Sequence, residues 1–187
     1  MKNLAIFASG EGTNAENLIN YFKDDSRVKI KLIITNNEKA GVIAHAEKYR
    51  KNVQIISKKA LETYTDQIIE FLKVEKIDLI VLAGFLLKIP VPLIHAFPNK
   101  IINIHPSLLP KFGGKGMYGH HVHEAVLAAR EKTSGITVHF VNEEYDKGKV
   151  ILQLTCAIEE NETTDSLSAK IRKLEFEGLP AAIETLL

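Results

Sequence analysis

Short apolar runs alternate with amphipathic stretches along the first half of the chain. Runs of strand length occupy residues 4–8, 29–35, 53–56 and 79–83. Between these runs, apolar residues recur with a helical period in residues 13–22, 41–50 and 61–74. An alternation of strands and helices is typical of right-handed βαβ crossovers in a parallel sheet. The first half is therefore predicted to form a Rossmann-like α/β fold.

The second half of the chain follows a different pattern. An apolar strand is predicted at residues 100–103, and two more at residues 135–141 and 149–157. Only a short polar turn separates the last two, which favours an antiparallel hairpin. A closing helix is predicted over residues 165–187, where Pro180 is expected to kink or divide it. We expect one α/β domain over residues 1–187, with a mostly parallel, twisted sheet of about seven strands, helices on both faces and an antiparallel C-terminal hairpin.

Composition narrows the range of partners. The 187 residues suit a single domain, and 24 Lys and Arg against 23 Asp and Glu leave a net charge of +1. Because no basic field indicates nucleic acid and no charged run indicates a membrane, the expected partners are small molecules.

Cys156 is the single cysteine, which excludes an internal disulfide and fits a reducing compartment. The apolar N-terminus is too short for a signal peptide, so we expect a cytoplasmic protein, and composition leaves a homodimer open.

Two polar residues lie at the end of the strand predicted at residues 100–103. Asn103 and His105 are two positions apart, so in a strand their side chains point to the same side. Pro106 then ends the strand, which places the pair where open α/β sheets bind their ligands. An amide and an imidazole aimed together favour chemistry at one reacting atom. The alternative is a loop histidine that only hydrogen-bonds to backbone.

A glycine turn joins the first predicted strand to the first helix. Gly10 and Gly12 would let backbone N–H groups approach a phosphate closely, and the helix N-terminus adds a partial positive charge. Thr13 and Glu16 have the spacing of a capping box for that helix. The turn matches neither a complete G-x-G-x-x-G nor a Walker A motif, so a plain tight turn is the alternative.

Asp146 lies in the predicted hairpin turn, where an acid near glycine is most often simple turn chemistry. If the sheet brings Asp146 to His105, the carboxylate is expected to raise the pKa of His105, which would make the protonated histidine a proton donor near neutral pH.

The glycine-dense loop at residues 111–120 is expected to be a mobile flap over a ligand, with a disordered surface loop as the alternative.

Several histidines do not enter this hypothesis. His120, His123 and Glu124 share one helical face with spacing that could bind zinc. No H-E-x-x-H motif or cysteine partner accompanies them, so we predict no metal and interpret them as the polar start of a helix. His45 and His139 are interpreted as structural.

Four segments together resemble one family over nearly the whole chain, the folate-dependent phosphoribosylglycinamide formyltransferases. The segments are Ser9-Gly-Glu-Gly-Thr-Asn14, Val81-Leu-Ala-Gly-Phe85, Asn103-Ile-His-Pro-Ser-Leu-Leu-Pro110, and Gly135-Ile-Thr-Val-His-Phe-Val141 followed by Asp146. The resemblance implies transfer of a formyl group from the cosubstrate 10-formyltetrahydrofolate to the amine of glycinamide ribonucleotide, in purine synthesis and without a metal.

The resemblance also implies roles for individual residues. Asn103 would orient the formyl oxygen, His105 would donate a proton, and Asp146 would tune His105. The ribonucleotide would contact Gly12, Thr13, Asn14 and Glu175. The folate would contact Leu86, Leu87, Lys88 and Ile89 together with Asn103. Apart from Glu175 and residues 86–89, we expect about residues 1–100 to form the half that binds the phosphate and ribonucleotide, and about residues 101–187 to form the half with the catalytic and folate sites.

Other functions stay open at this point. Methionyl-tRNA formyltransferase and formyltetrahydrofolate deformylase resemble the same core with an added domain, whereas this chain is expected to begin at its first strand and end with its last helix. An amino-sugar nucleotide could be the acceptor instead, because pocket shape decides the acceptor more than fold does. A non-catalytic nucleotide- or folate-binding module would need the glycine turn without the set Asn103, His105 and Asp146.

Overall fold

The computed structural model describes all residues, 1–187. The strands are β1 (Lys2–Phe7), β2 (Val28–Thr35), β3 (Asn52–Ile55), β4 (Leu79–Leu82), β5 (Ile101–His105), β6 (Thr133–Phe140) and β7 (Val150–Ala157). The helices are α1 (Thr13–Tyr21), α2 (Val42–Lys48), α3 (Lys58–Thr63), α4 (Thr65–Val74), α5 (Val91–Ala96), α6 (His120–Ala128) and α7 (Thr164–Glu184). None of these helices has the length and apolar character needed to cross a membrane.

The strands follow the order β3-β2-β1-β4-β5-β6-β7 in a seven-stranded sheet. β1 pairs in parallel with both β2 and β4, and β2 pairs in parallel with β3. β6 and β7 are antiparallel, with Thr137 opposite Gln153. The predicted fold class, a mostly parallel α/β sheet with an antiparallel C-terminal hairpin, is confirmed.

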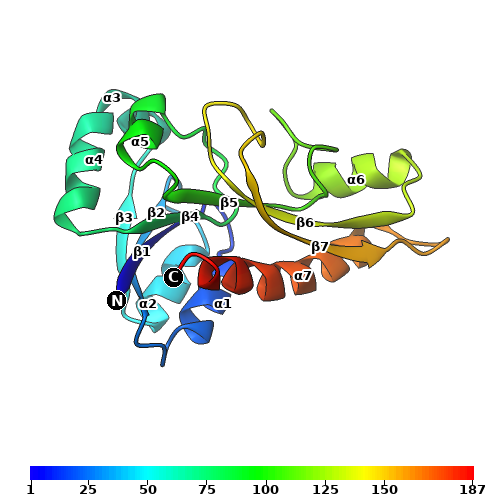
Figure 1. Ribbon diagram of the computed structural model, residues 1–187, viewed down its shortest axis with the longest axis horizontal. Coiled ribbons are helices and arrows are strands. Elements are labelled where there is room, and N and C mark those ends of the chain that lie inside the picture. The colour runs from blue at the N-terminus through cyan, green and yellow to red at the C-terminus, as the bar shows by residue number, and fades with distance from the viewer. The chain divides into compact units, whose positions relative to one another are not determined.

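Two compact units divide the chain, one over Met1–Ile102 with Leu187 and the other over Asn103–Leu186. The first unit has its core around β1 and β4, which are buried on both faces like central strands of a parallel sheet. In Figure 1, α1 and α2 lie on one side of the strands of this unit, and α3, α4 and α5 lie on the other. The assignment of residues 1–187 to a single domain stays a prediction.

The second unit is built on the β6–β7 hairpin. α7 packs along both strands of the hairpin and also contacts α6. A capping box starts α7, in which the Thr163 hydroxyl accepts from the Ser166 N–H and the Ser166 hydroxyl accepts from the Thr163 N–H. Gly178 lets α7 approach the sheet, because a Cβ at this position would lie 2.5 Å from Ile136 Cδ1.

Some predicted helix boundaries were wrong. The predicted capping box at Thr13 and Glu16 is absent, because Gly12 is the N-cap residue and Thr13 is already helical. The helix predicted over residues 61–74 is two helices, broken at Tyr64 (φ −115°, ψ 33°). Here the Thr65 hydroxyl donates to the Leu61 carbonyl at 2.7 Å, an example of a threonine competing for a helical backbone acceptor.

Two other helices differ from prediction. α5 was not predicted, because six residues that include a proline carry too little periodicity to show a helix. α7 is not divided at Pro180 but continues to Glu184. Pro180 is buried, like Leu179 beside it, so tertiary packing outweighs the preference of proline against helix interiors.

Candidate active site

The strand β5 presents Asn103 and His105 to the same carboxylate. Asn103 Nδ2 lies 3.5 Å from Asp146 Oδ1, and His105 Nδ1 lies 3.7 Å from Asp146 Oδ2. The strand alternation that predicted a shared direction for the two side chains is therefore confirmed. β5 continues through His105, so both groups are fixed by the sheet and not by a loop.

Asp146 is held in place by the turn that follows β6. Its φ of 55° lies in the left-handed region, which aspartate tolerates better than most residues do. The Gly114 N–H donates to Asp146 Oδ2 at 2.8 Å. Only 11 % of the Asp146 side chain is exposed. The carboxylate is therefore an ordered, mostly desolvated acceptor and not a solvated turn residue.

His105 is buried, and a backbone carbonyl defines its tautomer. His105 Nε2 lies 2.8 Å from the Phe112 carbonyl oxygen, and because a carbonyl only accepts, Nε2 carries a proton. In the neutral ring, Nδ1 is then unprotonated and faces Asp146. A second proton on Nδ1 would complete an ion pair with the carboxylate.

The pKa of His105 lies below the ordinary histidine value, mainly because burial penalises the charged ring. Asp146 and the Phe112 carbonyl act in the opposite direction, while His139 adds to the lowering. The expected rise in the pKa of His105 was therefore wrong in its net sign. The carboxylate does favour the imidazolium, but desolvation outweighs it.

The pKa of Asp146 is also lowered. Burial is the largest single influence and opposes ionisation, but the His139 ring, the Gly114 N–H and the His105 ring together outweigh burial. Asp146 is consequently a carboxylate at neutral pH and supplies a fixed negative charge beside both histidines.

His139 belongs to this cluster, although it was interpreted as structural. His139 Nε2 lies 3.2 Å from Asn103 Nδ2 and 3.5 Å from Asp146 Oδ1. Its Nδ1 donates to the Phe140 carbonyl at 2.8 Å, which leaves Nε2 of the neutral ring to accept from the Asn103 amide. Period-two counting back along β6 from the turn could have placed His139 near Asp146, but nothing in the sequence fixed the conformation of the turn.

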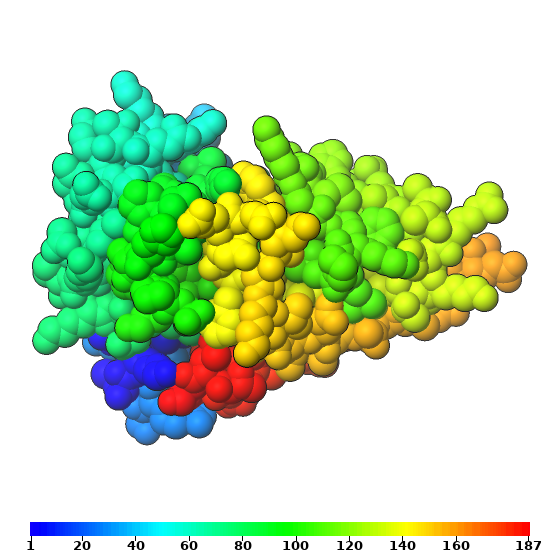
Figure 2. Space-filling model, turned by 45° about the horizontal axis from the view of Figure 1, so that its top comes forward, coloured from blue at the N-terminus to red at the C-terminus, as the bar shows by residue number.

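The loop at residues 111–119 contacts the site on another side. Besides the bonds from Phe112 and Gly114, Gly113 packs so tightly that a Cβ there would lie 2.5 Å from Leu109 Cδ2 and 3.1 Å from Asp146 Cβ. Figure 2 shows this loop (green) and the turn between β6 and β7 (yellow) at the surface. The loop is thus hydrogen-bonded to two members of the proposed catalytic set, His105 and Asp146.

The predicted phosphate turn lies in the first unit. Gly12 has φ 78°, and a Cβ there would lie 2.5 Å from Val42 Cβ, so both conformation and packing require glycine. Thr13 and Asn14 form the first turn of α1. A backbone bond from Val42 N–H to the Gly10 carbonyl ties the turn to the start of α2. The turn presents a helix N-terminus, as an anion site requires.

The residues predicted to contact folate follow β4 in the first unit. Leu86 is 55 % exposed, whereas Ile89 is buried. The Leu86 N–H already donates to the Ser9 hydroxyl at 2.9 Å, so this donor is occupied within the protein. Glu175, predicted to contact the ribonucleotide, is a half-buried residue of α7 in the second unit.

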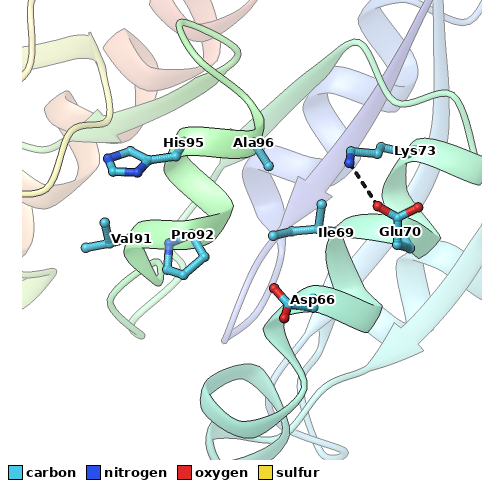
Figure 3. A pocket seen from close by; sticks show the side chains of 8 residues that line it. All are labelled: Asp66, Ile69, Glu70, Lys73, Val91, Pro92, His95 and Ala96. Atoms are coloured by element: carbon cyan, nitrogen blue, oxygen red, sulfur yellow. Dashed lines mark hydrogen bonds and ion pairs between the residues drawn. The ribbon is translucent and has the colours of Figure 1, made fainter.

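A groove in the first unit contains none of the predicted site residues. It lies between α4 and α5, has a volume of about 500 Å³, and is lined by both apolar and polar side chains, the polar ones including Asp66, Glu70 and His95 (Figure 3). Glu70 pairs with Lys73 at 2.9 Å on one wall. The groove thus lies outside the proposed catalytic set.

Comparison with known proteins agrees with these observations. Residues 2–183 match the model of the formyl transferase family. The phosphoribosylglycinamide formyltransferase of Bacillus subtilis is 36% identical over 191 residues, covering 100% of this chain and 95% of the relative. The chain belongs to the phosphoribosylglycinamide formyltransferase family. The resemblance expected from the sequence motifs is thereby confirmed.

Two solved structures of this family match the chain over nearly their whole length. The crystal structure of phosphoribosylglycinamide formyltransferase from Bacillus halodurans aligns with a TM-score of 0.90 at 36% identity, covering 100% of this chain and 95% of the other. The crystal structure of glycinamide ribonucleotide transformylase 1 from Geobacillus kaustophilus aligns with a TM-score of 0.91 at 34% identity, covering 100% of this chain and 99% of the other.

A longer relative matches only in part. The chloroplastic phosphoribosylglycinamide formyltransferase of Arabidopsis thaliana is 38% identical over 175 residues, and the chain spans 60% of its length.

Proposed function

We propose that this chain is a phosphoribosylglycinamide formyltransferase (EC 2.1.2.2). It transfers the formyl group of 10-formyltetrahydrofolate to the amine of N1-(5-phosphoribosyl)glycinamide, giving formylglycinamide ribonucleotide and tetrahydrofolate in purine biosynthesis. Family membership supports the proposal, and one observation carries it: Asp146 contacts both Asn103 and His105, the residues to which the family resemblance assigns the chemistry. A binding module would not need this cluster.

The amine nitrogen attacks the formyl carbon, so negative charge develops on the formyl oxygen and positive charge on nitrogen. The Asn103 amide and a protonated His105 stabilise the oxygen, as preorganised donors do in acyl transfer. His105 Nδ1 is the proton donor, because Nε2 is already committed to the Phe112 carbonyl. Collapse of the tetrahedral intermediate then breaks the bond to N10 of the folate, which takes up a proton. No covalent enzyme intermediate is needed.

Asp146 has two tasks in this mechanism. Its charge raises the fraction of His105 that is protonated, against the burial that lowers the pKa of His105. It also accepts the proton that leaves the attacking nitrogen, because it is the ionised carboxylate in contact with both Asn103 and His105. Both tasks require an ionised carboxylate, in agreement with the lowered pKa of Asp146.

Substrate binding is proposed for the remaining residues. Gly12, Thr13 and Asn14 bind the ribonucleotide phosphate at the start of α1, and Glu175 binds the ribonucleotide from α7. Residues 86–89 border the folate and Asn103 contacts its formyl group. The substrates are both small molecules. A cytoplasmic location accords with the free thiol of Cys156, and a homodimer stays a prediction.

The test uses purified protein and 10-formyltetrahydrofolate, with and without glycinamide ribonucleotide, and follows formation of tetrahydrofolate. We expect release only with the acceptor. Release without the acceptor would identify a hydrolase. No release in either sample would contradict the proposal and direct the search to another acceptor, such as an amino-sugar nucleotide, or to a binding role.

A further inference from the structure

A hydrogen-bonded network lies behind the proposed catalytic residues and reaches the edge strand β7. Thr137 on β6 is completely buried, and its hydroxyl donates to the Ser107 carbonyl at 2.7 Å and accepts from the Leu109 N–H at 3.0 Å. These bonds fasten the chain immediately after β5 to the neighbouring strand. Thr137 thus fixes the turn that begins two residues after His105.

Gln153 completes the network from the opposite strand. Its Nε2 donates to Thr137 Oγ1 at 2.9 Å and to the Leu109 carbonyl at 3.0 Å. Gln153 lies opposite Thr137 in the antiparallel pair, so the sheet itself aims the amide at the turn. Thr137 Oγ1 thus accepts from both Gln153 Nε2 and the Leu109 N–H, which leaves its own proton to be donated to the Ser107 carbonyl.

The turn held by Gln153 leads directly to the groups around His105. The Ser107 hydroxyl donates to the Lys111 carbonyl at 2.8 Å, and the next carbonyl, that of Phe112, accepts from His105 Nε2. Two residues later, the Gly114 N–H donates to Asp146. Movement of the turn would therefore displace one partner of each of these two ionisable groups.

We propose that Gln153 is a positioning residue for formyl transfer, because its carboxamide locks the Ser107–Leu109 turn and thereby the Phe112 carbonyl and Gly114 N–H against His105 and Asp146. This inference rests on the proposed function for its kinetic consequence. The hydrogen bonds of the Gln153 carboxamide go to Thr137 and Leu109 and not to the proposed catalytic set, so in this proposal Gln153 acts only through those two residues.

The decisive variant is Gln153→Met, which keeps the length of the side chain and removes its donors. Gln153 is exposed on β7, so this variant is expected to fold. Thr155→Val is the matched control, because Thr155 is an exposed residue on the same face of β7, two positions further along. Thr137→Val removes the buried hydroxyl and tests the same network by a second route.

The first readout is hydrogen exchange of the Gly114 amide, measured without substrates. In Gln153→Met and in Thr137→Val we expect exchange to be about threefold to tenfold faster, as the loss of a hydrogen bond of ordinary strength gives. The Thr155→Val protein should match the wild type. Unchanged exchange in Gln153→Met, or equal acceleration in Thr155→Val, would overturn the proposal.

The second readout is the pH dependence of kcat for formyl transfer. Loss of the Phe112 carbonyl as a partner lowers the pKa of His105 further, so the alkaline limb in Gln153→Met should move to lower pH, with kcat falling more than KM changes. A proportional fall in kcat at every pH would overturn the positioning role. If the wild-type protein transfers no formyl group, the proposed function fails, while the exchange experiment still decides whether Gln153 holds the turn.

Discussion

At the scale of single residues, the site depends on a balance between burial and one carboxylate. Only 4 % of the His105 side chain and 11 % of the Asp146 side chain are exposed. Burial lowers the pKa of His105, and Asp146 is the strongest of the groups that oppose this effect. The supply of protonated His105 is therefore sensitive to the charge at position 146.

Asp146→Asn should shift the pH–rate profile along the pH axis and not only reduce the rate. Without the carboxylate the pKa of His105 falls, so the alkaline limb of the pH–rate profile should move to lower pH by about one unit. The measurement is kcat/KM for formyl transfer as a function of pH. Glu144→Gln removes an exposed carboxylate from the same turn and should leave the limb in place. A limb that is unmoved in Asp146→Asn would contradict the assigned role.

The sequence predicted part of the residue-level arrangement. Asn103 and His105 could be placed together because strand alternation depends only on spacing. His139 could not be connected to Asp146, because their contact depends on a turn whose left-handed φ at Asp146 the sequence does not specify. The sign of the shift in the pKa of His105 was missed for a similar reason, since the depth of burial is a property of the folded chain.

At the scale of elements, the turn between β1 and α1 shows how closely packing constrains the proposed phosphate-binding turn. Gly12 combines a positive φ with a close approach to Val42, whereas nothing lies within 4 Å of a Cβ placed on Gly10. The two glycines look equivalent in the sequence. In the structure, only Gly12 has neighbours that leave no room for a Cβ.

Gly12→Ala should therefore destabilise the protein by about 2–4 kcal/mol, the combined cost of a left-handed non-glycine residue and of overpacking. Gly10→Ala should change the free energy of unfolding by less than about 0.5 kcal/mol. Urea denaturation of the two variants gives the comparison. Equal stabilities would show that the turn at Gly12 relaxes freely.

Element prediction succeeded where hydrophobic periodicity was strong and failed where local hydrogen bonds decided the outcome. The parallel strands and the β6–β7 hairpin were predicted within a few residues. The break at Tyr64 was missed because the apolar pattern continues through it. The cap at Gly12 was missed because the Thr13 and Glu16 spacing imitates a capping box.

At the scale of the whole molecule, buried histidines link stability to pH. Burial is the main cause that lowers the pKa of His105 and of His123, and His120 and His105 add to the effect on His123. A lowered pKa means that the unfolded chain binds more protons than the folded protein below the ordinary value of about 6.5. The stability that these histidines contribute is therefore fully present above that pH and is lost as the pH falls from there through their lower pKa values in the folded protein.

His123→Gln should weaken this pH dependence. When the pH is lowered from about 7 to about 5, the urea concentration at the unfolding midpoint of the wild type should decrease. The decrease should be smaller in the variant, because one buried titrating group is gone. His121→Gln, which replaces an exposed neighbour on α6, should keep the wild-type dependence. A fall as steep in His123→Gln as in the wild type would contradict a contribution from His123.

The most direct test of the central claim is a comparison of the His105→Ala variant with the wild type in turnover and in ribonucleotide binding. If His105 donates the proton, kcat should fall by about 10²–10⁴-fold, while the Kd for glycinamide ribonucleotide changes little, since the proposed phosphate site is at the start of α1. A variant that keeps wild-type turnover would contradict the account, because the contact between His105 and Asp146 would then have no part in formyl transfer.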